Sequence, residues 1–167
     1  MSSLTHIWLG TVVLLQGDPA GAEVEIRQGL EIARSRGDRL STYVALYNLS
    51  QAALAASEHQ RAREFLEEGI VLSEQTLDLA NLAYFLDTLA VVEAADGRLE
   101  RVPVLLGAAR AFRDTVGGVY AYYVPDESLR AAAERQAQDV LGADAYGEGF
   151  DRGRGLDLTA SVRFALA

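Results

Sequence analysis

The chain has 167 residues, a formal net charge of -9 and no cysteine. An acidic chain repels a phosphate backbone, so we expect no direct binding of nucleic acid. The absence of cysteine excludes disulfides, thiolate metal sites and a cysteine nucleophile, and it fits a reducing, cytoplasmic location. Half of the residues are hydrophobic and only three are proline, which favours a helical domain with a proper core.

The first segment, "MSSLTHIWLGTVVLLQGD", predicts a core helix over residues 4–15. No Lys or Arg precedes the apolar run, so it lacks the charged start of a signal peptide. The run is also shorter than the roughly 20 residues that cross a bilayer, so we expect no membrane association. The helix is apolar nearly all round, and we expect it to be covered on more than one side, by a second copy or by an upstream repeat.

A repeat organises the rest of the first 116 residues. First helices are predicted at 4–15, 39–56 and 79–95, and each precedes a second, amphipathic helix after a short turn. The second helices align without gaps at a register of 40 residues. Corresponding positions are Ala22, Ala62 and Val102; Ile26, Leu66 and Leu106; and Gly29, Gly69 and Ala109. The last set is small and lies within the helices, which predicts close approach of a neighbouring helix.

Three helical hairpins at a fixed period predict an all-α solenoid over residues 1–116. Beyond it, Gly117-Gly118 are expected to end one helix and Pro125-Asp126 to begin the next. Helices are predicted at 126–141, 143–152 and 158–166, the last capped by Asp157 or Thr159. We interpret residues 117–167 as capping helices of the same domain.

The hairpins resemble tetratricopeptide repeats. That family carries a Leu-Gly-like pair on the first helix and a small residue early on the second. The period of 40 is longer than the usual 34 of that family, so HEAT-like repeats remain the alternative fold. The pairs here are Leu9-Gly10 before Ala22, Leu49-Ser50 before Ala62 and, as a departure, Leu89-Ala90 before Val102.

The terminal segment is similar to a known architectural region. It contains the helix "GRLERVPVLLGAA", the pair Leu141-Gly142 and the closing "VRFAL", with Phe150, Gly153 and Leu156 between them. These features resemble the C-terminal tetratricopeptide-like region of actinobacterial ATPase/LuxR-type transcriptional regulators. The resemblance implies a protein-interaction module of a regulator in signal transduction, or an effector-sensing module. It implies no ATPase activity, because the chain has no GxxxxGK[ST] loop.

The stretch "GEGFDRGRG" at residues 147–155 has four glycines but does not fit a phosphate-binding loop. It follows a predicted helix rather than a strand, and its spacing is not G-x-G-x-x-G. We expect Gly147 and Gly149 to allow close packing, and Gly153 or Gly155 to end the helix in a left-handed turn. Arg152 and Arg154 are then solvated.

No combination of residues predicts catalysis, so we expect neither an enzyme nor a cofactor. There is no G-x-S-x-G and no HExxH, and the two histidines, His6 and His59, have no paired ligand spacing that would predict a metal site. Glu64, Glu67 and Glu68 have the spacing of a solvated helix face.

The remaining candidate is a concave groove that binds a protein or peptide partner. The expected groove residues are Thr11, Tyr47, Gln51, Tyr84 and Asp87. Replacing Tyr47 and Asp87 together by alanine is then predicted to weaken binding without lowering the melting temperature. The tyrosines at 120, 122 and 123 are expected to cover the end of the helices rather than to anchor a partner. A small-molecule sensor, or a free-standing repeat protein that forms a homo-oligomer through helix 4–15, remains the alternative.

Overall fold

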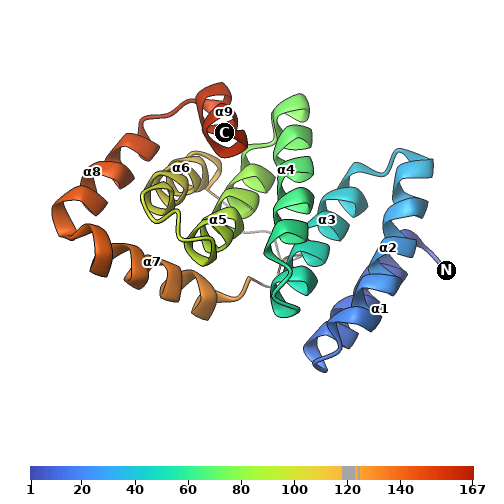
Figure 1. Cartoon of the computed structure of the whole chain (residues 1–167). Coiled ribbons are helices and arrows are strands. Elements are labelled where there is room, and N and C mark those ends of the chain that lie inside the picture. Colours follow the sequence, from blue (N-terminus) through green and yellow to red (C-terminus); the bar gives the residue numbers. More distant parts are fainter. Residues whose placement is uncertain (118–122, 124) are drawn as a thin grey trace. The chain divides into compact units, whose positions relative to one another are not determined.

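The computed structural model describes residues 1–117, 123 and 125–167, and these residues form nine helices and no strand. Consecutive helices pack antiparallel, and short turns join the helices from α1 to α6 (Figure 1). The helices are α1 (Ser3–Leu15), α2 (Pro19–Arg36), α3 (Arg39–Ala55), α4 (His59–Thr76), α5 (Leu79–Ala95), α6 (Arg101–Val116), α7 (Glu127–Leu141), α8 (Ala143–Arg154) and α9 (Leu158–Leu166). The prediction of an all-helical chain and of its helix positions is confirmed.

Aspartate side chains fix where many of these helices begin. Asp38 and Asp78 each accept a hydrogen bond from the main-chain N–H three residues ahead, at the starts of α3 and α5. Asp126 does the same for α7, and Asp157 for α9, where it accepts from Ala160 at 2.8 Å. Such a cap satisfies an N–H that has no partner within the helix. Of the two predicted caps for the last helix, Asp157 is therefore the one used.

The turns after the helices follow a regular spacing. Residues in the left-handed backbone region recur every 20 positions along the first 117 residues. Two helices with their turns therefore account for the period of 40. Two of these positions hold residues with a Cβ, although this conformation favours glycine. The positions are Gly17, Gly37, Ser57, Leu77, Gly97 and Gly117.

The chain divides into two compact units, Met1–Phe65 and Leu66–Ala167. In the first unit α2 packs against both α1 and α3. Gly29 of α2 lies so close to α1 that a Cβ would come within 2.7 Å of the Ser3 carbonyl oxygen. The predicted close approach at Gly29 is confirmed, and Ile7 and Ile26 are fully buried in the resulting core.

In the second unit α6 packs against α5 and α8, and α7 and α9 complete the same unit. Gly69 of α4 lies against the ring of Phe85, which confirms the second predicted close approach. The division of the chain into repeats over 1–116 and a cap over 117–167 stays a prediction. No helix among the described residues is both long and apolar enough to cross a membrane.

Two of the four glycines of residues 147–155, Gly149 and Gly153, serve the contact between α6 and α8. A Cβ on Gly153 would overlap the main-chain carbonyl of Val104, and one on Gly149 would come within 2.8 Å of Pro103. Close packing at Gly149 is thus confirmed. The expectation for Gly147 is wrong, because no atom lies within 4 Å of where its Cβ would be.

The predicted left-handed helix end in this stretch is also wrong. Gly153 lies inside α8, and Gly155, which follows the helix, has a right-handed φ of -86°. The glycine at 153 is needed for contact with α6 rather than for a turn. Arg152 and Arg154 are exposed, as predicted.

Candidate functional site

Three of the five expected groove residues lie in the first unit, and two of them are internal. Tyr47 exposes 1% of its surface and Thr11 is also buried. The Thr11 hydroxyl donates to the Ile7 carbonyl at 2.8 Å and accepts from Asn48 Nδ2 at 3.1 Å. Only Gln51 is partly exposed. Truncating Tyr47 would therefore act on stability, contrary to the expectation that it affects binding alone.

The other two expected groove residues, Tyr84 and Asp87, lie on α5 in the second unit. Tyr84 is buried, and its ring centroid lies 4.5 Å from that of Tyr123 at an angle of 52°. The buried Tyr123 hydroxyl donates to the side-chain oxygen of Asn81. Tyr123 thus packs within its own unit, in line with the covering role expected of it. The tyrosines at 120 and 122 lie outside the described residues.

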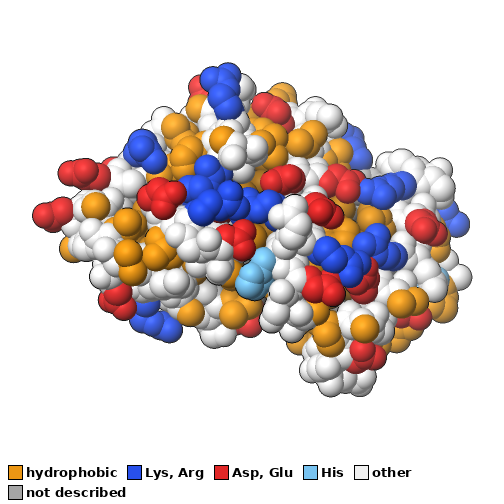
Figure 2. All heavy atoms as spheres, in the orientation of Figure 1, with side chains coloured by type: hydrophobic (Ala, Val, Ile, Leu, Met, Phe, Trp, Pro, Cys, Tyr) orange, Lys and Arg blue, Asp and Glu red, His pale blue; other side chains and the backbone are white. Residues whose placement is uncertain are grey.

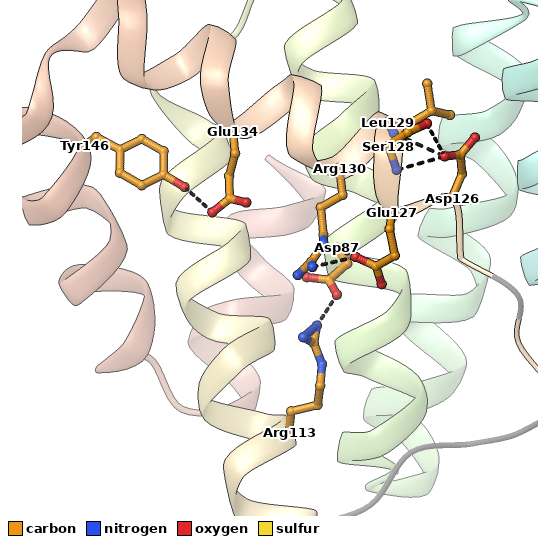
Figure 3. Close-up of polar contacts among 9 residues, drawn as sticks. All are labelled: Asp87, Arg113, Asp126, Glu127, Ser128, Leu129, Arg130, Glu134 and Tyr146. Carbon is orange, nitrogen blue, oxygen red and sulfur yellow. Dashed lines mark hydrogen bonds and ion pairs between the residues drawn. The ribbon is translucent and has the colours of Figure 1, made fainter.

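Asp87 belongs to a polar cluster between α5, α6 and α7 (Figure 3). Arg113 of α6 donates to its carboxylate. Arg130 of α7 points toward the same carboxylate and is itself held by Glu127, with Nη2 to Oε2 at 2.6 Å. Burial raises the pKa of Asp87 to about 6, against the opposing effect of the two guanidinium groups.

A second pair extends this cluster toward α8. The Tyr146 hydroxyl donates to Glu134 of α7 at 3.1 Å (Figure 3). Burial, and then the negative charge of Glu134, raise the pKa of the Tyr146 phenol. The buried residues of α7 are only Ala133 and Ala137, and the Tyr146–Glu134 hydrogen bond joins this helix to α8. The cluster holds helices together, and its charges already have partners.

Glu93 forms another internal ion cluster in the second unit. Its fully buried carboxylate lies 3.0 Å from Arg101 Nε and 2.7 Å from Arg98 Nε. Arg101 also donates to the carbonyls of Phe164 and Ala165 at 2.6 and 3.1 Å, at the C-terminal end of α9. The sequence pattern could not show either cluster, because the partners come from separate helices. Both have a structural role.

The accessible candidate surface is the outer face of α1, which we define as Thr5, Trp8, Leu9, Val12 and Leu15. All five side chains are exposed, with Trp8 at 39%, Val12 at 49% and Leu15 at 72%. The opposite side of the helix is buried against α2 and α3: Ile7 packs beside Gly29 of α2, and Thr11 accepts a hydrogen bond from Asn48 of α3. Cover of the outer face by a second copy or an upstream repeat stays a prediction.

The repeat register shows that this exposure is unusual. All five residues of the outer face have equivalents 40 and 80 positions later, in α3 and α5. The equivalents of Leu15, which are Ala55 and Ala95, are exposed, whereas those of the other four residues are buried. The buried equivalents are Ala45 and Phe85 for Thr5, Asn48 and Thr88 for Trp8, Leu49 and Leu89 for Leu9, and Ala52 and Val92 for Val12. The fold thus covers in its later first helices most of a face that it leaves open in α1.

Two shallow pockets offer less to a ligand. One, of about 240 Å³, lies in the first unit beside Arg27, Arg61 and Glu23. Its charges are already paired, since both arginines contact Glu23. The other, of about 290 Å³, lies in the second unit beside Glu100 and Arg152. Both are smaller than the roughly 300–1,000 Å³ usual for small-molecule sites.

On the face of the molecule shown in Figure 2, charges of the two signs are mixed. Among the described residues, no three His, Asp or Glu side chains come close enough to hold a metal ion. No family model, curated protein or solved structure matches the chain.

Proposed function

We propose that this protein is a non-catalytic interaction module and that the outer face of α1 is its contact surface. The observation that carries the proposal is the difference in burial between that face and its equivalents in α3 and α5. Exposed apolar side chains that adjoin one another mark interaction surfaces in soluble proteins. Trp8 lies among them, and tryptophan is enriched at the energetic centres of interfaces.

The hairpin organisation supports a repeat module of tetratricopeptide type as the scaffold. Helix pairs such as α1–α2 and α5–α6 pack closely within each unit, and the register of 40 residues relates them. The resemblance of the terminal segment to LuxR-type regulators suggests that the module serves a transcriptional regulator in the cytoplasm. A HEAT-like repeat is the alternative scaffold, and it would leave the proposed contact surface unchanged.

A small-molecule sensor has weaker support. Such a site needs an enclosed apolar pocket with a few converging polar groups. The two pockets here are small and the first is lined by paired charges. The exposed surface of α1 is instead largely apolar, which suits another helix rather than a small ligand.

Site-specific photocrosslinking in the source cells tests the proposal. A photoreactive amino acid at Val12 is expected to form a covalent adduct with another protein chain on illumination. The matched control carries the same group at Val140, an equally apolar residue of α7 that is 68% exposed. An adduct at both positions, or at neither, would contradict the proposal.

A further inference from the structure

We infer that the partner of the outer face of α1 is a second copy of this chain, which pairs its own α1 with the first. The inference rests on the proposed function and names the occupant of the same surface. Three observations support it: the spacing of the exposed residues, the absence of charge, and the position of the tryptophan.

The exposed residues form the seam of a two-helix pair. Thr5, Trp8, Val12 and Leu15 of α1 are all exposed and follow one another at spacings of three and four residues. This alternation places them in one narrow stripe along the helix, the pattern that pairs helices in coiled coils. A sheet or a loop would cover a wider face of the helix than this stripe. The spacing therefore predicts that the occupant is another helix.

The charge pattern favours a second copy as the source of that helix. Of the helices that the structure describes, α1 alone contains no Asp, Glu, Lys or Arg. A two-fold contact places a surface against itself, so that any charge near the axis meets a like charge. The chain carries a net charge of -9, and α1 is the helix on which two copies can meet without that repulsion. A partner selected by charge would find nothing to recognise on this face.

Trp8 lies one residue from the middle of α1, which runs from Ser3 to Leu15. In a two-fold pairing of either direction, the middle residue of each helix lies near its symmetry mate. The largest side chain of the face therefore lies near the centre of the contact, where binding energy concentrates. At about 1.5 Å per residue, the 13 residues of α1 extend about 20 Å. A contact this short predicts a weak, reversible dimer rather than an obligate one.

Sedimentation equilibrium of the purified full chain, over a range of concentrations, tests the inference. We expect a monomer–dimer equilibrium that Val12→Glu and Leu15→Glu each weaken at least tenfold, because each places two like charges in the contact. Val140→Glu is the matched control, since it makes the same change on α7 and should leave the dissociation constant within a factor of two. Added salt should strengthen the dimer, because it screens the repulsion between two acidic chains.

The glutamate variants could weaken the dimer by disturbing the fold, so a variant that is expected to bind more tightly is tested as well. Thr5 is the one polar residue of the stripe, and Thr5→Leu is expected to tighten the dimer about tenfold by adding buried apolar surface. A chain that stays monomeric even as Thr5→Leu, or a dimer that neither glutamate variant weakens, would overturn the inference. In the photocrosslinking experiment, an adduct at twice 18.0 kDa would support it. An adduct of another mass would overturn it while leaving the proposed interaction role intact.

Discussion

Arg113 of α6 donates a hydrogen bond to the Asp87 carboxylate of α5, in a position that Arg130 of α7 also faces (Figure 3). Asp87 therefore links α5 to α6 and faces a guanidinium group of α7, the next helix along the chain. The two guanidinium groups only partly compensate the carboxylate for its loss of water, so its pKa is raised to about 6. The pair joins α5 to α6, and its strength depends on pH.

The raised pKa of Asp87 predicts a pH-dependent free energy of unfolding. The folded chain holds this proton up to about pH 6, whereas an unfolded aspartate loses it near pH 4. The contribution of Asp87 to stability is therefore greatest below about pH 4 and declines as the pH rises through 6. Between pH 4.5 and 7.5 the decline amounts to about 2 kcal/mol.

Urea unfolding of the native chain and of Asp87→Asn at these two pH values measures that decline. The asparagine variant lacks the titrating group. Its free energy of unfolding, minus that of the native chain, should therefore increase by about 2 kcal/mol from pH 4.5 to pH 7.5. A difference between the two proteins that stays constant with pH would contradict the raised pKa.

The contact between α6 and α8 predicts opposite effects of one substitution at two glycines of α8. Gly153→Ala should destabilise the chain by about 1–3 kcal/mol, because the added methyl group overlaps the Val104 carbonyl. Gly147→Ala should stabilise it by about 0.5–1 kcal/mol, because the site is open and alanine favours helix. Thermal unfolding monitored by circular dichroism would show the two shifts in melting temperature. Shifts of the same sign would be incompatible with this contact.

The turn between α4 and α5 predicts a stabilising substitution. Leu77 has a φ of 55° and is 74% exposed, so its side chain gains little from burial while its Cβ disfavours the conformation. Leu77→Gly should therefore increase the free energy of unfolding by about 1 kcal/mol. Leu77→Ala keeps a Cβ and serves as the control, for which we expect no such gain. Equal effects of glycine and alanine would refute the explanation.

The buried Glu93 predicts that its two arginine partners differ in importance. Arg101→Met leaves a buried carboxylate undercompensated and removes the contact with the end of α9, so we expect a loss of about 3–5 kcal/mol. Arg98 is more exposed than Arg101, and Arg98→Met should cost no more than about 1 kcal/mol. Chemical denaturation gives both values, and similar losses for the two variants would contradict the account.

The helices could be predicted from the sequence because their local signals agree. Asp38 and Asp78 cap helices in the same register as the hydrophobic repeat, and Gly29 and Gly69 report the close contact of neighbouring helices. Local signals determine such features, so no knowledge of distant contacts is required.

The groove residues were less predictable for a physical reason. A first helix such as α3 is covered on several sides, and helical spacing alone cannot tell which polar residue is buried by a neighbour. Tyr47 and Thr11 are therefore internal, although their positions suggested a groove. The Asp87 cluster depends on residues from three helices, and only the structure brings them together.

The sequence likewise suggested a glycine turn where the structure has continuous helix. Gly153 is part of α8, and its lack of a side chain serves the approach to Val104. A glycine near a predicted helix end can either end the helix in a left-handed turn or let a neighbouring helix come close. The sequence does not show which neighbour approaches it, so it cannot separate the two. For α1, the apolar composition predicted cover on more than one side, and what covers its exposed outer face stays a prediction.

The most direct test of the central claim, that the outer face of α1 is buried in an assembly, uses the intrinsic fluorescence of Trp8. It is the only tryptophan of the chain and lies in the proposed contact. As the protein concentration rises, we expect its emission to shift to shorter wavelength and its quenching by acrylamide to decrease, with Thr5→Leu showing both changes at lower concentration. Emission and quenching that do not vary with concentration in either protein would contradict the claim.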